Sequence, residues 1–140
     1  MSGVYLSSRE FYIYAMTDVI KLKGADSFTD DQFFEFCRVN DDFHIERDAN
    51  GNIIIMDLTG SETGNLNSEV HYEVSHWNRE TEKGKTFDSS TGFTLPDSSV
   101  RGPDTSWIAL ERWKALPKEE RKRFAQISPD FVIEIRSEND

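Results

Sequence analysis

Residues 131–135 read Phe-Val-Ile-Glu-Ile, and four of these five residues are apolar and mostly β-branched or aromatic. Such a run predicts a β-strand that is covered on both faces. Side chains alternate along a strand, so Glu134 shares one face with Val132 and Arg136. An ionised carboxylate among apolar neighbours is costly unless a cation or hydrogen-bond donors satisfy it. We therefore expect Glu134 either to pair with Arg136 or to bind a metal ion.

Two further carboxylates stand near predicted secondary structure. Asp104 follows Pro103, which favours an extended entry into a strand over residues 104–109, although an ordinary turn aspartate is the alternative. Glu69 lies on a helix predicted over residues 65–81, where an exposed surface position is the alternative. Oxygen ligands from two strands and a helix suit Mg²⁺ or Mn²⁺, which polarises a phosphodiester and lowers the pKa of bound water.

An N-terminal helix is predicted from a capping box. Thr29 can cap the amide of Gln32, Gln32 can reciprocate, and Phe28 can pack on Phe33 at the start of a helix that ends near Val39. A β-hairpin follows, in which Asn-Gly at positions 50–51 would supply the two positive-φ residues of a tight turn. These signals predict an α/β protein that begins with a helix and a hairpin.

The rest of the chain alternates short β-type and helical patterns. On the predicted 65–81 helix, the apolar residues recur at spacings of four, four and three, at Leu66, Val70, Val74 and Trp77. The predicted strands cover residues 43–47, 52–58, 85–88, 92–95 and 104–109, and a helical stretch over 110–126 is interrupted at Pro117, which can open a second helix. Residues 1–27 show no clear period and form an unassigned arm; residues 28–140 form the predicted domain.

Composition limits the class of protein. The chain has 140 residues with 16 Lys and Arg against 26 Asp and Glu, a net charge of −10 that disfavours non-specific binding to nucleic acid. There is no long apolar run and no basic-then-apolar leader, which predicts an intracellular, cytoplasmic protein. A single cysteine, Cys37, excludes an internal disulfide, and His71 and His76 are spaced wrongly for a shared metal ion.

One short segment departs from the acidic background. Between Glu111 and Arg123 there are six basic residues and three acidic ones. A solvated helix face is the ordinary interpretation of such a run. The alternative is contact with a nucleic-acid backbone through Lys114, Lys118, Arg121, Lys122 and Arg123.

Three segments stand in a characteristic order: GFTLPD at 92–97, RGPDTSWI at 101–108 and SPDFVIEIRS at 128–137. Together they resemble the Uma-two family of endonucleases, a branch of the PD-(D/E)XK, or restriction-endonuclease-like, superfamily. The likeness runs from about residue 28 to residue 140. No single motif carries it; the order and spacing of all of them do.

This resemblance implies a central mixed β-sheet flanked by helices and a Mg²⁺- or Mn²⁺-dependent endonuclease whose substrate is DNA. Asp104 matches the family's PD aspartate and Glu134 its second acid. Glu69, or alternatively Asn67, matches the helix position that completes such sites. The implied metal ligands are therefore Asp104, Glu134 and Glu69, with Arg136 added as the residue that steadies the phosphate.

Two departures from the family pattern accompany the resemblance. Arg136 stands where the superfamily has lysine, and in the Uma-two branch that lysine is on a following helix. We expect the domain to lack its C-terminal helix and strand, and an uncovered apolar edge would favour association, including a homodimer. The alternative function is a non-catalytic acidic binding module that keeps the nuclease fold.

Overall fold

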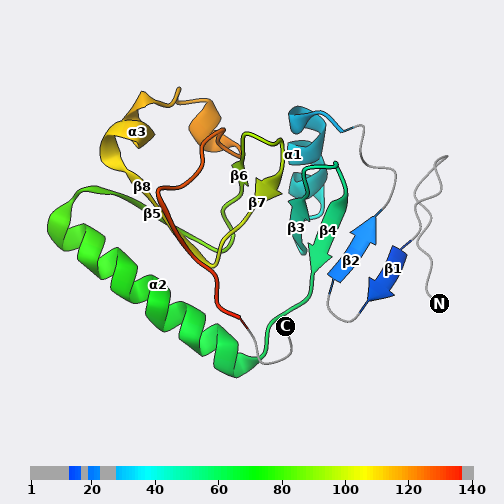
Figure 1. Cartoon of the computed structure of the whole chain (residues 1–140), viewed down its shortest axis with the longest axis horizontal. Coiled ribbons are helices and arrows are strands. Elements are labelled where there is room, and N and C mark those ends of the chain that lie inside the picture. The colour runs from blue at the N-terminus through cyan, green and yellow to red at the C-terminus, as the bar shows by residue number, and fades with distance from the viewer. Residues whose placement is uncertain (1–12, 17–18, 23–27, 137–140) are drawn as a thin grey trace. The chain divides into compact units, whose positions relative to one another are not determined.

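The computed structural model describes residues 13–16, 19–22 and 28–136, and the chain divides into two compact units (Figure 1). Unit 1 consists of Met1–Asp57 and Leu95–Arg101, and unit 2 of Leu58–Thr94 and Gly102–Asp140. Much of the arm predicted at residues 1–27 lies outside the described residues, as do residues 137–140. Within the described ranges, no helix has the length and apolar character needed to cross a membrane.

Unit 1 combines one described helix with an antiparallel sheet in the order β1-β2-β4-β3-β7. Its elements are β1 Ile13–Met16, β2 Val19–Leu22, α1 Asp30–Val39, β3 His44–Arg47, β4 Ile53–Met56 and β7 Val100–Arg101. The sequence assigned no element to β1, β2 or β7. Strand β2 pairs with β4, and β7 pairs with β3. Because these partner strands are distant in the chain, local periodicity did not reveal β2 or β7.

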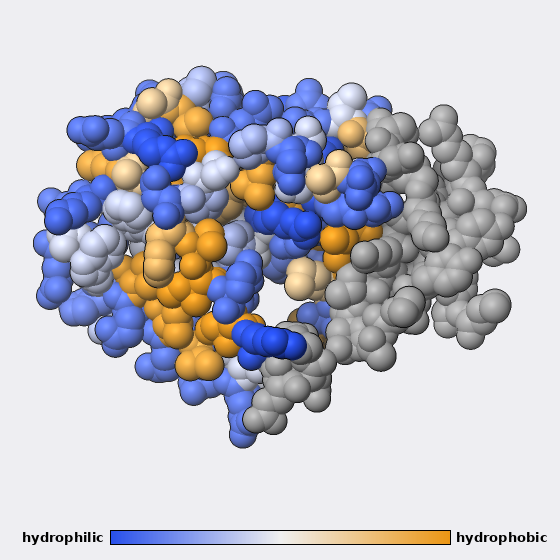
Figure 2. Space-filling model, viewed as in Figure 1, coloured by the Kyte–Doolittle hydropathy of each residue, from blue (hydrophilic) through white to orange (hydrophobic). Residues whose placement is uncertain are grey.

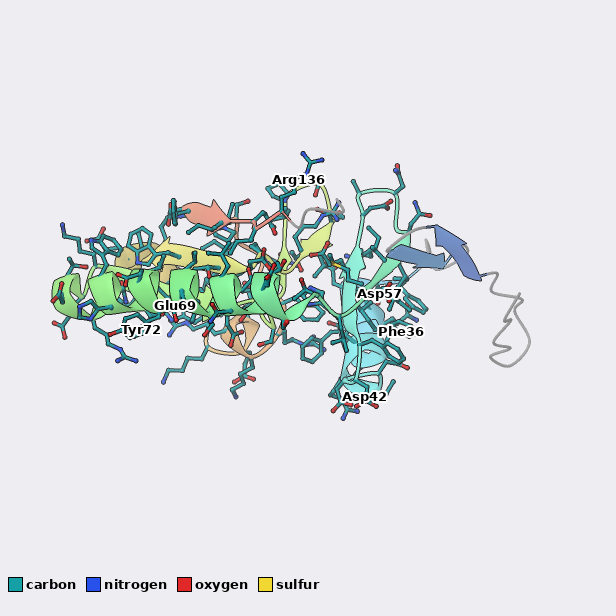
Figure 3. All side chains as sticks on the ribbon, turned by 90° about the horizontal axis from the view of Figure 1, so that it is seen from below. Phe36, Asp42, Asp57, Glu69, Tyr72 and Arg136 are labelled. Atoms are coloured by element: carbon teal, nitrogen blue, oxygen red, sulfur yellow. The ribbon has the colours of Figure 1, made fainter. Side chains whose placement is uncertain are left out.

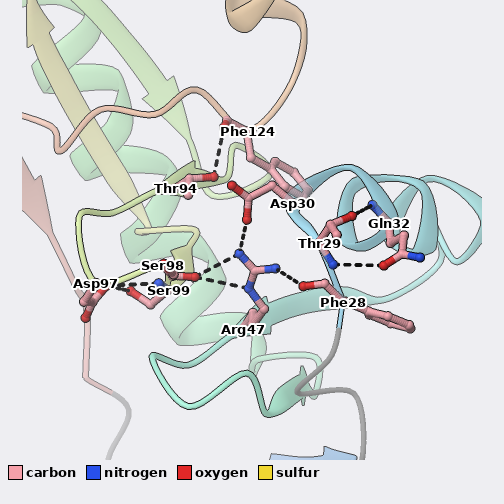
Figure 4. A network of polar contacts seen from close by, with 10 residues as sticks. All are labelled: Phe28, Thr29, Asp30, Gln32, Arg47, Thr94, Asp97, Ser98, Ser99 and Phe124. Atoms are coloured by element: carbon pink, nitrogen blue, oxygen red, sulfur yellow. Dashed lines mark hydrogen bonds and ion pairs between the residues drawn. The ribbon is translucent and has the colours of Figure 1, made fainter.

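The start of α1 confirms the predicted capping box. The Thr29 hydroxyl accepts the N–H of Gln32 at 3.2 Å, and the Gln32 side chain accepts the N–H of Thr29 at 3.0 Å (Figure 4). The ring of Phe28 packs against Phe36, with 5.5 Å between ring centroids, one turn beyond the predicted partner Phe33. Local sequence therefore determines where this helix begins.

The β3–β4 hairpin is confirmed, but its turn differs from the prediction. Gly51 has a φ of 82°, whereas Asn50 does not have a positive φ. The Asp48 carboxylate accepts the N–H groups of Asn50 and Asn52, each at 2.9 Å. This side-chain anchor stabilises a longer turn in which glycine alone adopts the left-handed conformation.

Arg47 is a buried charge of unit 1, with 3% of its surface exposed. It pairs with Asp30 and donates to the carbonyl oxygens of Phe28, at 3.3 Å, and Ser98, at 2.9 Å (Figure 4). Its guanidinium also lies 4.9 Å from the centroid of the Phe33 ring. A buried cation needs such a set of partners, and here they join α1, β3 and the 95–101 segment.

Unit 2 places helices beside an antiparallel sheet in the order β5-β8-β9. Its elements are β5 Gly84–Asp88, β8 Thr105–Ala109, β9 Phe131–Ile133, β6 Phe93–Thr94, α2 Ser61–Thr81, α3 Leu110–Ala115 and a 3₁₀ turn, Glu120–Lys122. Helix α2 packs along β5 and β8 (Figure 1). The buried apolar side chains of this unit are Phe93, Ile108, Ala125 and Ile127. The predicted α/β fold class is confirmed, and the strand pairs described here are antiparallel.

Two helix predictions in unit 2 need correction. Helix α2 begins at Ser61, not near residue 65, so the weak helix propensity of the Gly, Ser and Thr residues there does not set its start. The predicted second helix after Pro117 is only a short 3₁₀ turn. The Arg121 guanidinium donates to the carbonyl oxygens of Leu116, at 2.7 Å, and Lys114, at 2.8 Å, so this side chain satisfies carbonyl groups at the end of α3.

The strand predicted over residues 131–135 is also shorter and less buried than expected. β9 ends at Ile133, and Phe131 and Val132 are 48% and 47% exposed. The prediction of a strand covered on both faces is therefore wrong among the described residues. The reason is position, because β9 is an edge strand of the sheet. Figure 2 shows apolar surface alongside α2 on the face of the molecule that is in view.

Candidate metal centre at Asp104

Asp104 lies immediately before β8, and two different segments hold its carboxylate. Oδ2 accepts the N–H of Ile135 at 2.6 Å, and Oδ1 accepts an amide hydrogen of Asn67 at 3.3 Å. Asn67 belongs to α2, and Ile135 follows β9. The partly buried carboxylate is therefore fixed between a helix and the chain that leaves the neighbouring strand.

The strand register brings Glu134 to the same end of the sheet. β8 pairs with β9 so that Thr105 lies opposite Ile133, the last pair of this ladder. Asp104 directly precedes Thr105 and Glu134 directly follows Ile133, so both carboxylates flank the end of the paired strands. Glu134 is exposed, which corrects the expectation of a carboxylate enclosed by an apolar strand. Water can solvate the Glu134 carboxylate, so its charge alone does not require a metal ion.

Helix α2 presents Asn67, not Glu69, to Asp104. Two residues along a helix correspond to about 200° around its axis, so Glu69 points away from the contact that Asn67 makes. Glu69 is exposed on α2, and the exposed Arg136 points away from this helix (Figure 3). Asn67 was the alternative that the sequence left open for the helix position. The roles of Glu69 and Arg136 stay predictions.

The amide of Asn67 contains a polar atom that is unusual in a folded protein. Its Oδ1 is buried and has no hydrogen-bond partner. Leaving such an oxygen without a donor is costly, and a carboxamide oxygen is a ligand that hard cations accept. Asp104 and Asn67 Oδ1 therefore supply oxygen atoms of the kind that a divalent cation binds.

Such a centre would depend on water for its remaining ligands. Among the described residues, no group of three or more His, Cys, Asp and Glu side chains could hold a metal ion. Mg²⁺ is compatible with a smaller set, since it usually keeps several waters and takes one or two protein carboxylates.

The inner face of α2 is polar, which sequence reasoning missed. The predicted apolar stripe is partly exposed, with Leu66 at 50% and Trp77 at 44%. The residues that bond to the sheet follow the same spacing one position later, at Asn67, His71, Ser75 and Asn78. We name this set the polar seam. The signal was present in the sequence, but periodicity analysis counts apolar residues.

Three of the six basic residues between Glu111 and Arg123 make local contacts. Arg112 pairs with Asp130 at 2.6 Å, and Lys122 pairs with Glu119 at 2.8 Å. Arg121 lies 5.6 Å from the centroid of the Trp113 ring. Lys114 and Lys118 are exposed, so they are the members best placed to meet an anionic ligand.

The lone cysteine has no reactive character. Burial raises the pKa of the Cys37 thiol to about 12. A thiol with this pKa is almost entirely protonated at neutral pH and is a poor nucleophile.

Comparison with known proteins agrees with the motif-based resemblance. A family model, Uma2, described as "Putative restriction endonuclease", matches residues 30–140. A search of curated proteins finds no match to this chain. The matched region covers more than three quarters of the sequence, and the α/β architecture is consistent with a restriction-endonuclease-like fold.

Proposed function

Because this chain belongs to the Uma2 family of restriction endonucleases, we propose that it is a metal-dependent endonuclease that hydrolyses phosphodiester bonds of DNA in the cytoplasm. The observation that supports this proposal most is the Asp104 carboxylate held between α2 and the segment after β9, beside an unpartnered amide oxygen of Asn67.

The proposed centre assigns a role to each polar side chain. Asp104 and Glu134 would hold Mg²⁺ or Mn²⁺, with Asn67 Oδ1 as a further ligand in the helix position first assigned to Glu69. The cation, when bound, polarises the phosphodiester and lowers the pKa of a bound water. Arg136 steadies the phosphate, and it cannot act as a base because a guanidinium does not deprotonate in proteins.

The proposed reaction consumes one water. The water oxygen forms a new bond to phosphorus, the bond from phosphorus to one sugar oxygen breaks, and that oxygen leaves with a proton. Lys114 and Lys118, both exposed, are the proposed contacts to the DNA backbone. The homodimer expected from the exposed edge of β9 stays a prediction.

Plasmid nicking tests the proposal. The wild-type protein should convert supercoiled plasmid to the open-circular form with Mg²⁺ and not with EDTA. Asp104→Asn and Glu134→Gln should lose this activity, whereas Glu73→Gln should keep it, because Glu73 is an exposed α2 residue outside the proposed centre. Equal nicking by Asp104→Asn would refute the assignment of Asp104.

The second candidate is a non-catalytic acidic binding module, favoured by the net charge of −10 and by arginine at position 136. Calorimetric titration with Mn²⁺ separates the two. Saturable binding that Asp104→Asn abolishes supports the metal centre, and the absence of heat supports the module.

A further inference from the structure

We propose that His71 is a positioning residue for the Asp104 centre, which holds β8 against α2 through the Thr105 hydroxyl. This inference rests on the proposed function for its catalytic meaning, but its geometric content can be tested alone. His71 Nδ1 lies 3.3 Å from Thr105 Oγ1, and Thr105 directly follows Asp104 and is fully buried.

Hydrogen bonds on both sides of the imidazole fix its orientation. His71 Nε2 lies 3.3 Å from the Ser75 hydroxyl oxygen, and the Ser75 hydroxyl donates to Thr86 Oγ1 at 3.2 Å. In the tautomer that carries its proton on Nε2, His71 donates to the Ser75 hydroxyl oxygen and accepts from the Thr105 hydroxyl at Nδ1. With the Ser75 proton on Thr86, this tautomer gives every hydroxyl of this hydrogen-bonded series a partner. The variants at His71 are designed for this arrangement.

Thr105 lies close to both proposed acidic ligands, Asp104 and Glu134. It follows Asp104 in the chain and lies opposite Ile133, the residue before Glu134. One turn earlier on the polar seam, Asn67 bonds to Asp104 itself. Helix α2 therefore touches the start of β8 at two adjacent residues, and a shift of Thr105 would move Asp104 relative to the Ile135 N–H.

Two substitutions can test the contacts of the two imidazole nitrogen atoms one at a time. Asn places a polar atom where Nδ1 stands, so His71→Asn keeps an acceptor for Thr105 and loses the link to Ser75. Gln reaches the Nε2 position, so His71→Gln keeps a donor for Ser75 and loses the link to Thr105. If the seam only attaches the helix to the sheet, the two variants should behave alike. If His71 positions the centre, they should differ.

Amide hydrogen exchange of Ile135 reads the geometry without any metal ion. This N–H donates to Asp104, so its protection reports whether the carboxylate is in place. We expect wild type and His71→Asn to exchange similarly, and His71→Gln and His71→Ala to exchange roughly fivefold faster, since loss of one such bond is worth about 1 kcal/mol and about 1.4 kcal/mol is a factor of ten. Calorimetric titration with Mn²⁺ should follow the same order.

A second pair of variants at Thr105 tests the other end of the contact. Thr105→Ser keeps the hydroxyl, and Thr105→Val keeps the shape without it, so Ser should retain Ile135 protection and Val should lose it. Equal Ile135 exchange in the Asn and Gln variants at His71, or in the Ser and Val variants at Thr105, would overturn the inference. Absence of Mn²⁺ binding by the wild type, with the exchange pattern intact, would refute the proposed metal centre and leave His71 as a positioning residue.

Discussion

Replacing Asp104 by Asn or by Ala should separate its structural role from its proposed role as a metal ligand. The carboxylate accepts from the Ile135 N–H and from the Asn67 amide. Asp104→Ala leaves both donors without a partner in a partly buried site, which should cost about 2 kcal/mol of unfolding free energy.

Asp104→Asn should be far less destabilising, for a reason specific to this site. The new amide oxygen can accept from the Ile135 N–H, and its amide hydrogens can donate to Asn67 Oδ1 once that side chain turns over. The flip gives Asn67 Oδ1 a donor and moves the Asn67 NH2 group into the position where the wild type has an unpaired oxygen, so the number of unpaired polar groups does not change. We expect Asp104→Asn to lie within about 0.5 kcal/mol of wild type, a neutral exchange of hydrogen bonds.

Metal binding should show the opposite pattern, because the amide removes the charge that a divalent cation needs. Mn²⁺ at ten times its Kd should stabilise the wild type by about 1.4 kcal/mol. For 140 residues this is a rise in Tm of roughly 5 °C. Neither variant should show this rise.

Differential scanning calorimetry with and without Mn²⁺ measures both effects on the same samples. Asp104→Asn should match the wild type without Mn²⁺ and differ from it only with Mn²⁺ present. A variant that keeps the Mn²⁺-dependent rise in Tm would show that Asp104 is an anchor of the fold and not a ligand. An Asn variant as unstable as the Ala variant would refute the proposed turnover of Asn67.

Three further substitutions test the fold. Arg47→Met should lower the unfolding free energy by about 3 kcal/mol in urea titrations, because it strips the buried donors from Asp30 and two carbonyl oxygens; a loss under about 1 kcal/mol would contradict this. Gly84→Ala should be destabilising by at least ~1 kcal/mol, since its Cβ would lie 2.3 Å from the Ile108 carbonyl oxygen and the Trp107 ring; an unchanged urea midpoint would argue against that close approach. The Ala109 N–H and then Arg112 lower the pKa of Asp130 in the folded protein. The Asp130 carboxylate therefore stabilises the fold above its unfolded-state pKa, and this stabilisation is lost as the pH falls through the lower folded-state pKa. Asp130→Asn should therefore cost stability at pH 7, about 1 kcal/mol, and nothing in strong acid, and an equal cost at both pH values would contradict the assignment.

The features that sequence alone determined are those in which the interacting groups are near neighbours. Thr29 and Gln32 cap α1 as predicted because the box lies within four residues. The β3–β4 hairpin forms where predicted, though Asp48 rather than Asn50 shapes its turn. The motif order from residue 30 onward was sufficient to identify the family.

Tertiary structure decided which side chains meet. Whether Asn67 or Glu69 faces Asp104 depends on how α2 is rotated against β8, and that rotation follows from the polar seam, whose hydrogen bonds to distant strands no helical period of apolar residues reveals. The exposure of Glu134 likewise follows from β9 being an edge strand. Local energies set the elements, but the contacts between residues far apart in the chain set their orientation, and a candidate centre built from a helix and two strands depends on that orientation.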